Sequence, residues 1–303
     1  MKNKKNVSII IPYYLRLTKL KNLLKSLNLL NYSSELIEVI LIVDGSKIDQ
    51  IKIKNISKFK IKIIINKINK GVSFSRNAGI MSSKNNYLWF LDSDAEIIYP
   101  DTLNEMFKKI ELFKVDGITG YYENFDGNPY VQIPIPFPNM IVIEKFIKKK
   151  NFINRLVKMC AMTSVFIKKD TFLLKYGLFD ENLAIKEDEE LILNSKNRIF
   201  LISEKCLVKH NPELEYEKNI FNHIIDIIKV RTYTFSKHKK MKLLLIYDLF
   251  FIPLILFKLF FNKSITSRRT LSMNMDINLS KVIKILFALF KGYFSLGVNK
   301  NIK

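Results

Sequence analysis

Four short apolar runs in the first third of the chain constrain its fold more than any other feature. They cover residues 7–11, 36–43, 61–65 and 87–91, and each is a nearly continuous run rather than an alternation. Runs of this kind are typical of strands that are covered on both faces. Between the first two runs, leucines recur at a helical spacing, at positions Leu20, Leu23, Leu24, Leu27 and Leu30. The order predicts a parallel α/β sheet, either open or closed into a half-barrel.

Further elements are expected along the chain. Thr18 is the expected N-cap of the leucine-rich helix, and a second helix is expected over residues 72–82. Residues 103–113 predict another helix, followed by a strand over 162–167 and a helix from Asp170. The segment 117–139 has no regular period, and its prolines exclude a long helix there, so we expect a functional or disordered loop.

Bulk composition limits the class of protein. A length of 303 residues allows one large domain with an appendage, or two domains, and 48% apolar residues exclude general disorder. Cys160 and Cys206 form no metal-ligand spacing and no disulfide framework, which favours a reducing compartment. The apolar run that begins at Val7 is too short for a signal peptide, so export is not expected.

The positive charge is unevenly distributed. Of the formal net charge of +22, half lies in residues 237–303, where 13 lysines and arginines face only Asp248 and Asp276. Because this half is interleaved with long apolar runs, the distribution argues against nucleic-acid binding, which relies on clustered phosphate contacts.

Two carboxylates separated by one residue follow the fourth apolar run. Asp92 and Asp94 would lie at the carboxyl edge of the predicted sheet, where α/β folds place their sites. Their hard oxygen ligands suit a divalent cation that carries a diphosphate. Ordinary turn chemistry, in which Asp side chains bond their own backbone, is the alternative reading of the same three residues.

Several motifs surround this pair in a fixed order. They cover residues 7–14, 43–46, 69–80, 176–183 and 187–191, and they end at His210. With these motifs, residues 6–215 resemble the family 2 glycosyltransferases that use nucleotide sugars. The resemblance implies a GT-A-type, Rossmann-like α/β fold, with a mixed and mostly parallel sheet flanked by helices.

The resemblance also implies roles for individual residues. It assigns donor binding to Pro12, Tyr13, Asp44, Arg76, Asp92 and Asp94. Asp94 and His210 would hold Mg²⁺ or Mn²⁺ as a Lewis acid on the donor diphosphate. From local sequence alone, Asp44 could instead form an Asx-turn, Arg76 could be an exposed helix residue, and His210 could be structural.

The acidic segment at residues 187–191 contains the candidates for proton transfer. Asp188 matches the position of the family's catalytic base, which would activate an acceptor hydroxyl for one inverting displacement. The neighbouring Glu187 is the other candidate, and both could merely complement a helix dipole. Lys186 stands where relatives often have glycine, and the only tryptophan is Trp89, so the Gln-x-x-Arg-Trp motif of processive synthases does not occur.

The last part of the chain predicts a membrane-associating tail. Residues 243–261 are apolar but contain Asp248, Pro253 and Lys258, which penalise a full membrane span. Residues 282–298 form an apolar pattern, and one polar stripe beside it is formed by Lys281, Lys284, Lys291 and Ser295. A helix with this pattern is typical of the headgroup plane of an anionic leaflet. The alternative is a helix that covers a flank of the catalytic domain or a dimer contact.

Together these observations predict a catalytic domain over 1–235 and a basic, apolar helical tail over 236–303. The predicted activity is metal-assisted transfer of a single sugar, with inversion, to a glycan or lipid-linked acceptor at the cytoplasmic face of the membrane. The tail would attach the chain peripherally or as a C-terminal anchor. The alternatives are a nucleotidyltransferase, which would want a Gly-rich phosphate loop after the first strand, and a basic non-enzymatic scaffold that binds membranes or nucleic acid.

Overall fold

The computed structural model describes residues 5–123, 129–135, 141–146, 155–157, 161–183, 185–195, 199–210, 220–238 and 287. The chain divides into two compact units, and each is considered by itself. The first comprises Met1–Ile135 and Ile141–Pro212, and it contains the sheet. The second comprises Pro136–Met140 and Glu213–Lys303, and its described part is chiefly helix α7 (Ile220–Lys237).

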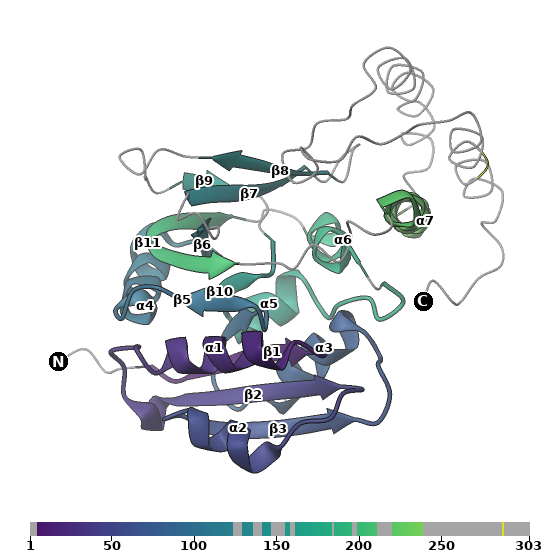
Figure 1. Ribbon diagram of the computed structural model, residues 1–303. Coiled ribbons are helices and arrows are strands. Elements are labelled where there is room, and N and C mark those ends of the chain that lie inside the picture. Colours follow the sequence, from purple (N-terminus) through teal and green to yellow (C-terminus); the bar gives the residue numbers. More distant parts are fainter. Residues whose placement is uncertain are drawn as a thin grey trace. The chain divides into compact units, whose positions relative to one another are not determined.

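The first half of the sheet confirms the four expected strands. They are β1 (Val7–Tyr13), β2 (Ile37–Asp44), β3 (Lys60–Asn66) and β4 (Tyr87–Leu91). All are parallel and lie in the order β3-β2-β1-β4; Figure 1 labels the first three. Because parallel strands end at one edge, the residues that follow β1, β2 and β4 are brought together.

The second half of the sheet is mixed. From β4 the order continues β10-β6-β11-β5, and β10 runs antiparallel to both of its neighbours. The mixed sheet expected of a GT-A-type fold is thereby confirmed. The strands of this half are β5 (Ala95–Ile97), β6 (Gly117–Glu123), β9 (Arg155–Val157), β10 (Ser164–Lys168) and β11 (Phe200–His210).

The expectation that residues 117–139 lack regular structure is wrong. This segment contains β6 and also β7 (Pro129–Ile135), which pairs antiparallel with β8 (Ile141–Phe146). Proline excludes a helix but is tolerated at strand starts and in edge strands, where no N–H is needed. Pro129 is accordingly the first residue of β7.

Helices cover both faces of the sheet. On one face, α1 (Leu17–Leu27) and α4 (Thr102–Phe113) pack on side chains such as Ile9 and Ile11, and α2 (Gln50–Ile56) adds Ile53. The other face carries α3 (Val72–Ser82), α5 (Lys169–Lys175) and α6 (Glu187–Asn194), grouped around Ile10. A short 3-10 turn, η1 (Ser34–Leu36), precedes β2. The two faces explain the unbroken apolar runs, since neighbouring positions on β1 are buried in opposite cores.

The start of α1 differs from the expected one. Arg16, not Thr18, is the N-cap residue, and it has the left-handed backbone conformation with φ 53°. Its carbonyl accepts a hydrogen bond from the Leu20 N–H at 3.2 Å.

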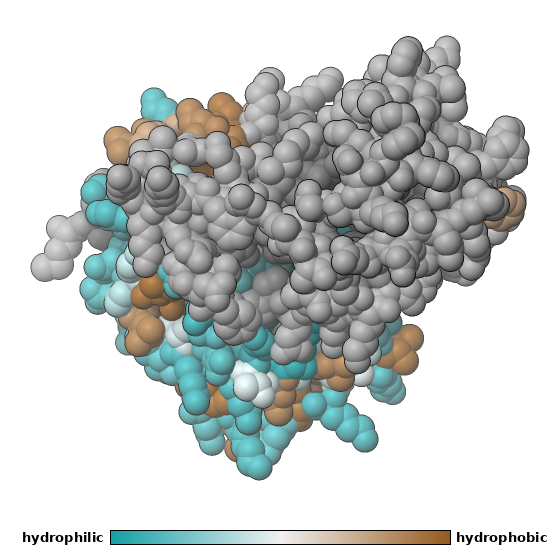
Figure 2. All heavy atoms as spheres, turned by 45° about the horizontal axis from the view of Figure 1, so that its top comes forward, coloured by the Kyte–Doolittle hydropathy of each residue, from teal (hydrophilic) through white to brown (hydrophobic). Residues whose placement is uncertain are grey.

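On the face drawn in Figure 2, hydrophilic residues make up most of the coloured surface, with hydrophobic residues in separate patches. Among the described residues, no helix is both long and apolar enough to cross a bilayer. The tail segments 243–261 and 282–298, for which membrane association is expected, lie outside the described residues apart from Phe287.

Candidate active site

The predicted donor residues gather at the carboxyl edge of the parallel strands. Tyr13 ends β1, Asp44 ends β2, and Asp92 follows β4 directly. In the register of the sheet, Tyr13 lies opposite Val43, the residue that precedes Asp44. Tyr13 and Asp44 are buried, with 3% exposure each. The edge therefore presents side chains from three adjacent strands.

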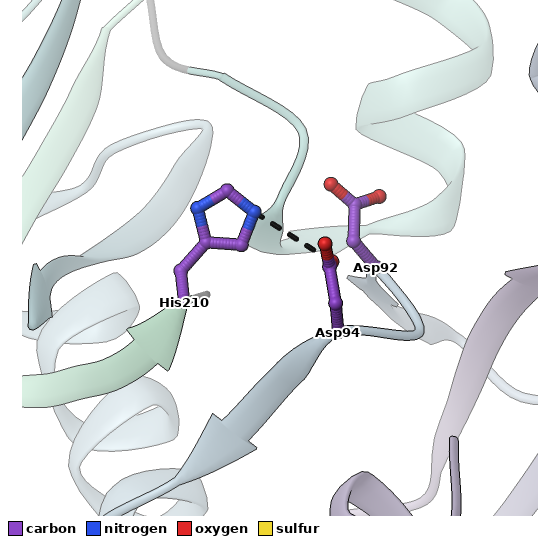
Figure 3. A group of neighbouring side chains, drawn as sticks. All are labelled: Asp92, Asp94 and His210. Carbon is purple, nitrogen blue, oxygen red and sulfur yellow. Dashed lines mark ion pairs between the residues drawn. The ribbon is translucent and has the colours of Figure 1, made fainter. Parts of the chain in front are cut away.

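Asp92, Asp94 and His210 form a compact group (Figure 3). Each offers one potential ligand atom, and these atoms lie within 4.8 Å of one another. The chain produces the group by pairing β5 with the end of β11, where Ala95 lies opposite His210. Sequence reasoning named all three residues, and the structure brings them together.

Asp94 is the electrostatic centre of this group. Its Oδ1 lies 3.6 Å from His210 Nε2, and its Oδ2 lies 3.6 Å from an Arg16 guanidinium nitrogen. Burial alone would raise the pKa of Asp94, but His210 and Arg16 outweigh burial and lower this pKa. Sequence reasoning missed Arg16, since a single arginine in a turn has no distinguishing pattern.

Arg76 connects two carboxylates from different elements. Its side chain is 4% exposed, donates to Asp92 Oδ1 at 2.9 Å and forms a short ion pair with Glu187. Burial opposes the charge, but Glu187, Asp92 and Asp188 together raise the pKa of the guanidinium. The planar fork suits two partners at once. Arg76 thereby links the end of β4 to the start of α6.

The acidic start of α6 contains one accessible carboxylate. Glu187, Glu189 and Glu190 are buried, whereas Asp188 is half-buried. Asp188 accepts the Glu189 N–H at 2.9 Å and lies 3.4 Å from the Met162 N–H. Burial raises the pKa of Glu187; Arg76 opposes this rise and Asp188 adds to it.

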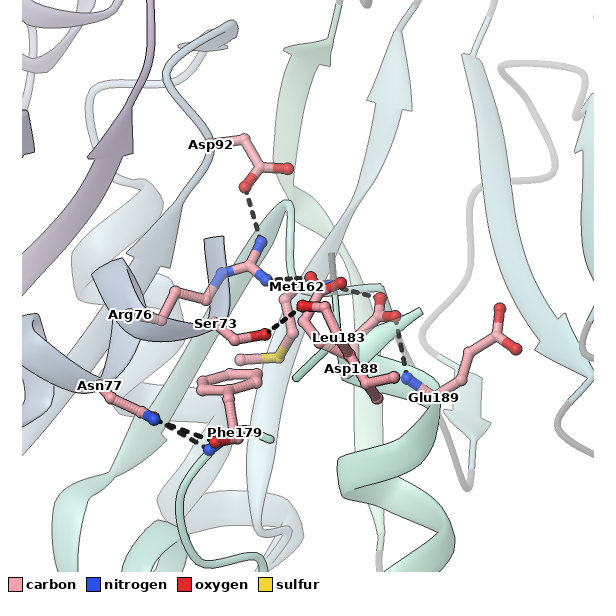
Figure 4. Close-up of polar contacts among 10 residues, drawn as sticks. Ser73, Arg76, Asn77, Asp92, Met162, Phe179, Leu183, Asp188 and Glu189 are labelled. Atoms are coloured by element: carbon pink, nitrogen blue, oxygen red, sulfur yellow. Dashed lines mark hydrogen bonds and ion pairs between the residues drawn. The ribbon is translucent and has the colours of Figure 1, made fainter. Parts of the chain in front are cut away.

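Helix α3 fixes the loop that leads into α6 (Figure 4). Asn77 donates to the Phe179 carbonyl and accepts from the Phe179 N–H, both at 2.9 Å. Ser73 donates to the Leu183 carbonyl at 2.9 Å. These contacts explain why the motif at 69–80 accompanies the motif at 176–183. Together they place the start of α6 relative to the sheet.

Asp44 organises the turn before α3. Its carboxylate accepts the backbone N–H groups of Lys70 and Gly71, at 2.9 and 2.8 Å, and the Asn66 amide at 2.8 Å. Two carboxylate oxygens offer about four acceptor positions, so one further hydrogen bond can be accommodated. The turn contacts and the implied base contact are therefore compatible. Pro12, the remaining donor residue, is half-buried in β1.

The group of Asp92, Asp94 and His210 fits a divalent cation. Two carboxylates supply the hard oxygen ligands that Mg²⁺ and Mn²⁺ prefer, and an imidazole can add a third contact. Four carboxylates face two arginines here, which leaves an excess of negative charge: Asp92, Asp94, Glu187 and Asp188 against Arg16 and Arg76. A doubly charged ion would balance that excess.

Comparison with known proteins defines the class. Residues 8–172 match the family model described as Glycosyl transferase family 2. Because this match covers more than half of the chain, the chain belongs to glycosyl transferase family 2. The expected family is confirmed.

Sequence relatives agree with this membership. The chain is 31% identical over 193 residues to an uncharacterized glycosyltransferase of Haemophilus influenzae, across 62% of this chain and 60% of the relative. It is also 31% identical over 122 residues to the glycosyltransferase GlyA of Streptococcus pneumoniae, across 40% of this chain and 17% of that protein. The chain therefore spans less than two thirds of each of these relatives.

Solved structures share the fold. S. aureus TarS 1-349 in complex with UDP-GlcNAc superposes with a TM-score of 0.59 at 18% identity, covering 95% of this chain and 81% of that one. GalNAc-T7 with UDP, GalNAc and Mn²⁺ gives a TM-score of 0.57 at 17% identity, covering 70% of this chain and 44% of that one. These likenesses confirm the GT-A-type arrangement expected from the sequence.

Proposed function

We propose that this protein transfers a single sugar from a nucleotide diphosphate sugar to a glycan or lipid-linked acceptor, with inversion at the anomeric carbon. One observation carries the proposal. In a member of family 2, the Asp92, Asp94 and His210 group is joined through Arg76 to the acidic start of α6. Arg76 thus links the proposed cation site to the helix start that carries the proposed base.

The donor would lie along the carboxyl edge of the sheet. Asp44, with Pro12 and Tyr13, would bind the nucleoside, and Asp92 would meet the ribose. Arg76 acts on the donor through Asp92, since its own guanidinium is buried between two carboxylates. Asp94 and His210 would hold Mg²⁺ or Mn²⁺, which would neutralise the charge of the departing diphosphate.

Asp188 is the proposed base. An acceptor hydroxyl oxygen forms the new bond to the anomeric carbon while the bond from that carbon to the diphosphate oxygen breaks. The hydroxyl proton passes to the Asp188 carboxylate, and the nucleoside diphosphate leaves with the bonding electron pair. The exposure pattern favours Asp188 over Glu187, because Glu187 is buried against Arg76.

A thermal-shift screen with and without Mn²⁺ tests the donor class. UDP and UDP-sugars come first, since the similar solved structures hold them. We expect one nucleotide to raise the melting temperature only when metal is present, because binding to the folded state stabilises it. Asp94→Asn should remove this shift. No shift with any nucleotide sugar would contradict the proposal.

The Asp188→Asn variant tests the base. Loss of a general base slows transfer by about 100- to 10,000-fold, whereas the metal-dependent nucleotide shift should persist. Asp101→Asn, at the exposed N-cap residue of α4, is the matched control and should keep wild-type rates. Loss of sugar transfer in both Asp94→Ala and Asp188→Ala would exclude the non-enzymatic scaffold.

A further inference from the structure

Arg16 has a position that helix formation does not explain. It is the N-cap of α1, but its side chain makes no cap hydrogen bond, and the first turn of α1 contains no acidic residue. A cation at a helix N-terminus is repelled by the positive end of the helix dipole. The ion pair with Asp94 offsets this repulsion.

The backbone at this point is also unusual. Leu15 and Arg16 both have positive φ values, 55° and 53°, although neither is glycine. Residues other than glycine visit this region rarely, and they do so where the surroundings fix them, often at functional sites. Two such residues in succession place Arg16 between the end of β1 and the predicted cation ligand.

The ion pairs of Asp94 with Arg16 and His210 are long. Both its ion pairs measure 3.6 Å, beyond the roughly 2.7–3.2 Å of a direct N–H···O hydrogen bond. Asp94 is 12% exposed and the Arg16 side chain is 26% exposed, so the pair is reached from solvent. A divalent cation that binds Asp94 would meet the positive charge of Arg16 at close range, and one of the two must move.

We propose that Arg16 is a tethered cation that neutralises Asp94 until a divalent ion binds there, and that then moves onto the diphosphate of the donor. This inference rests on the proposed function, because it takes the donor to be a nucleoside diphosphate sugar. The guanidinium fork matches phosphate oxygens, and the positive end of α1 favours an anion at the same place.

Two binding measurements test this role on the full chain. The first titrates Mn²⁺ without nucleotide and follows the free ion by electron paramagnetic resonance. Arg16→Asn removes the charge with a residue that tolerates the left-handed conformation. It should bind Mn²⁺ about 3- to 10-fold more tightly than wild type, since a competing charge is lost from a partly solvated site. Arg16→Lys should match wild type.

The second measurement titrates UDP at saturating Mn²⁺ by calorimetry. Here Arg16→Asn should bind UDP roughly 10-fold more weakly, because a charge-assisted contact to the diphosphate is lost. The UDP affinity of Arg16→Lys should lie between those of wild type and Arg16→Asn, since lysine keeps the charge and loses the planar guanidinium fork. The opposite signs of the two effects distinguish this role from a general loss of structure.

Controls isolate the Asp94 contact. Lys25→Ala removes one exposed positive charge from the other end of α1 and should change neither affinity. When Asp94 is already replaced by Asn, adding Arg16→Asn should no longer raise the Mn²⁺ affinity, because the coupling runs through Asp94. If Arg16→Asn does not fold, Arg16→Lys serves as the test. It should bind Mn²⁺ as wild type does and bind UDP more weakly.

Two results would overturn the proposal: Mn²⁺ binding by Arg16→Asn no tighter than by wild type, or UDP binding unaffected by this substitution. Failure of the proposed function looks different. Wild type would then bind Mn²⁺ and UDP with the expected Arg16 dependence and yet transfer no sugar.

Discussion

At the scale of single residues, the site depends on charges that are buried in pairs. Arg76 is the clearest case, since it serves Asp92 and Glu187 from a position with 4% exposure. Removing one partner from such a pair costs more than removing both, because the remaining charge is left without compensation.

Arg76→Met should therefore lower the free energy of unfolding by about 3–5 kcal/mol. The double variant with Glu187→Gln should recover part of this loss, because no carboxylate then remains buried without a partner at α6. Urea unfolding of the wild type, both single variants and the double variant measures the coupling. Additive losses would show that Arg76 and Glu187 do not stabilise each other.

Glu189 predicts a pH dependence of stability. Its side chain is 1% exposed, and burial raises its pKa to about 7, opposed by Lys186 and reinforced by Asp188. The unfolded chain releases this proton near pH 4.5, so between the two values the folded state binds more protons. The free energy of unfolding should therefore fall as pH rises from about 4.5 to about 7, by roughly 3 kcal/mol from this group.

Comparing Glu189→Gln with wild type isolates this contribution, because Glu187 and Asp94 titrate in both proteins. Urea unfolding from pH 4.5 to 8 should give a shallower slope for the variant. Parallel curves for the two proteins would mean that Glu189 titrates as an ordinary exposed carboxylate.

At the scale of elements, helix α6 depends on how it begins. Lys186 precedes the helix with φ 61°, a conformation suited to glycine, and its side chain pairs with Glu189. Its carbonyl accepts the Glu190 N–H at 3.1 Å. The charged side chain thus compensates for a backbone cost that glycine would not incur.

Replacing Lys186 separates these two effects. Lys186→Ala loses the ion pair and keeps the backbone cost. Lys186→Gly also loses the ion pair, but glycine adopts this conformation without that cost. We expect the alanine variant to be less stable than the glycine variant by about 1 kcal/mol. Gly177→Ala is the matched reference, since Gly177 has φ 77° and an added Cβ meets no atom within 4 Å. Equal stability of the two Lys186 variants would place the left-handed conformation in doubt.

The elements also show what the sequence could predict. The parallel strands and helices α1 and α3 were predictable, because unbroken apolar runs and a leucine stripe follow directly from burial on two faces. Strand β7 was missed because its segment shows no regular period and its prolines exclude only a helix; β8, which contains no proline, was not predicted either. Short α2 and β5 carry too few apolar residues to show a period.

The site was predictable where motifs marked it. Asp92 and Asp94 follow one strand and were paired from the sequence itself, whereas His210 comes from a distant segment and family resemblance alone joined it to them. The pairing of Arg76 with Glu187 joins positions 111 residues apart in the chain, and nothing local to either one indicates it. The roles given to these residues stay predictions until the variants are measured.

At the scale of the whole molecule, charge is divided between a catalytic part and a basic tail. Half of the net charge of +22 lies in residues 237–303, together with apolar runs. Attachment of this tail to an anionic cytoplasmic leaflet is a proposal from the sequence, and it would bring lipid-linked acceptors to the site.

The lysine stripe makes this attachment testable. Replacing Lys281, Lys284 and Lys291 with glutamine should weaken binding to phosphatidylserine-containing vesicles about 100-fold, because each lysine contributes about 1 kcal/mol at an anionic surface. Cosedimentation of the full chain with such vesicles measures this loss, and added salt should weaken wild-type binding in the same direction. The control replaces Lys25, Lys54 and Lys60, which are exposed on the sheet-containing unit, and changes net charge equally. If both triple variants bind alike, total charge and not the tail stripe holds the protein at the membrane, and the attachment proposed here is wrong.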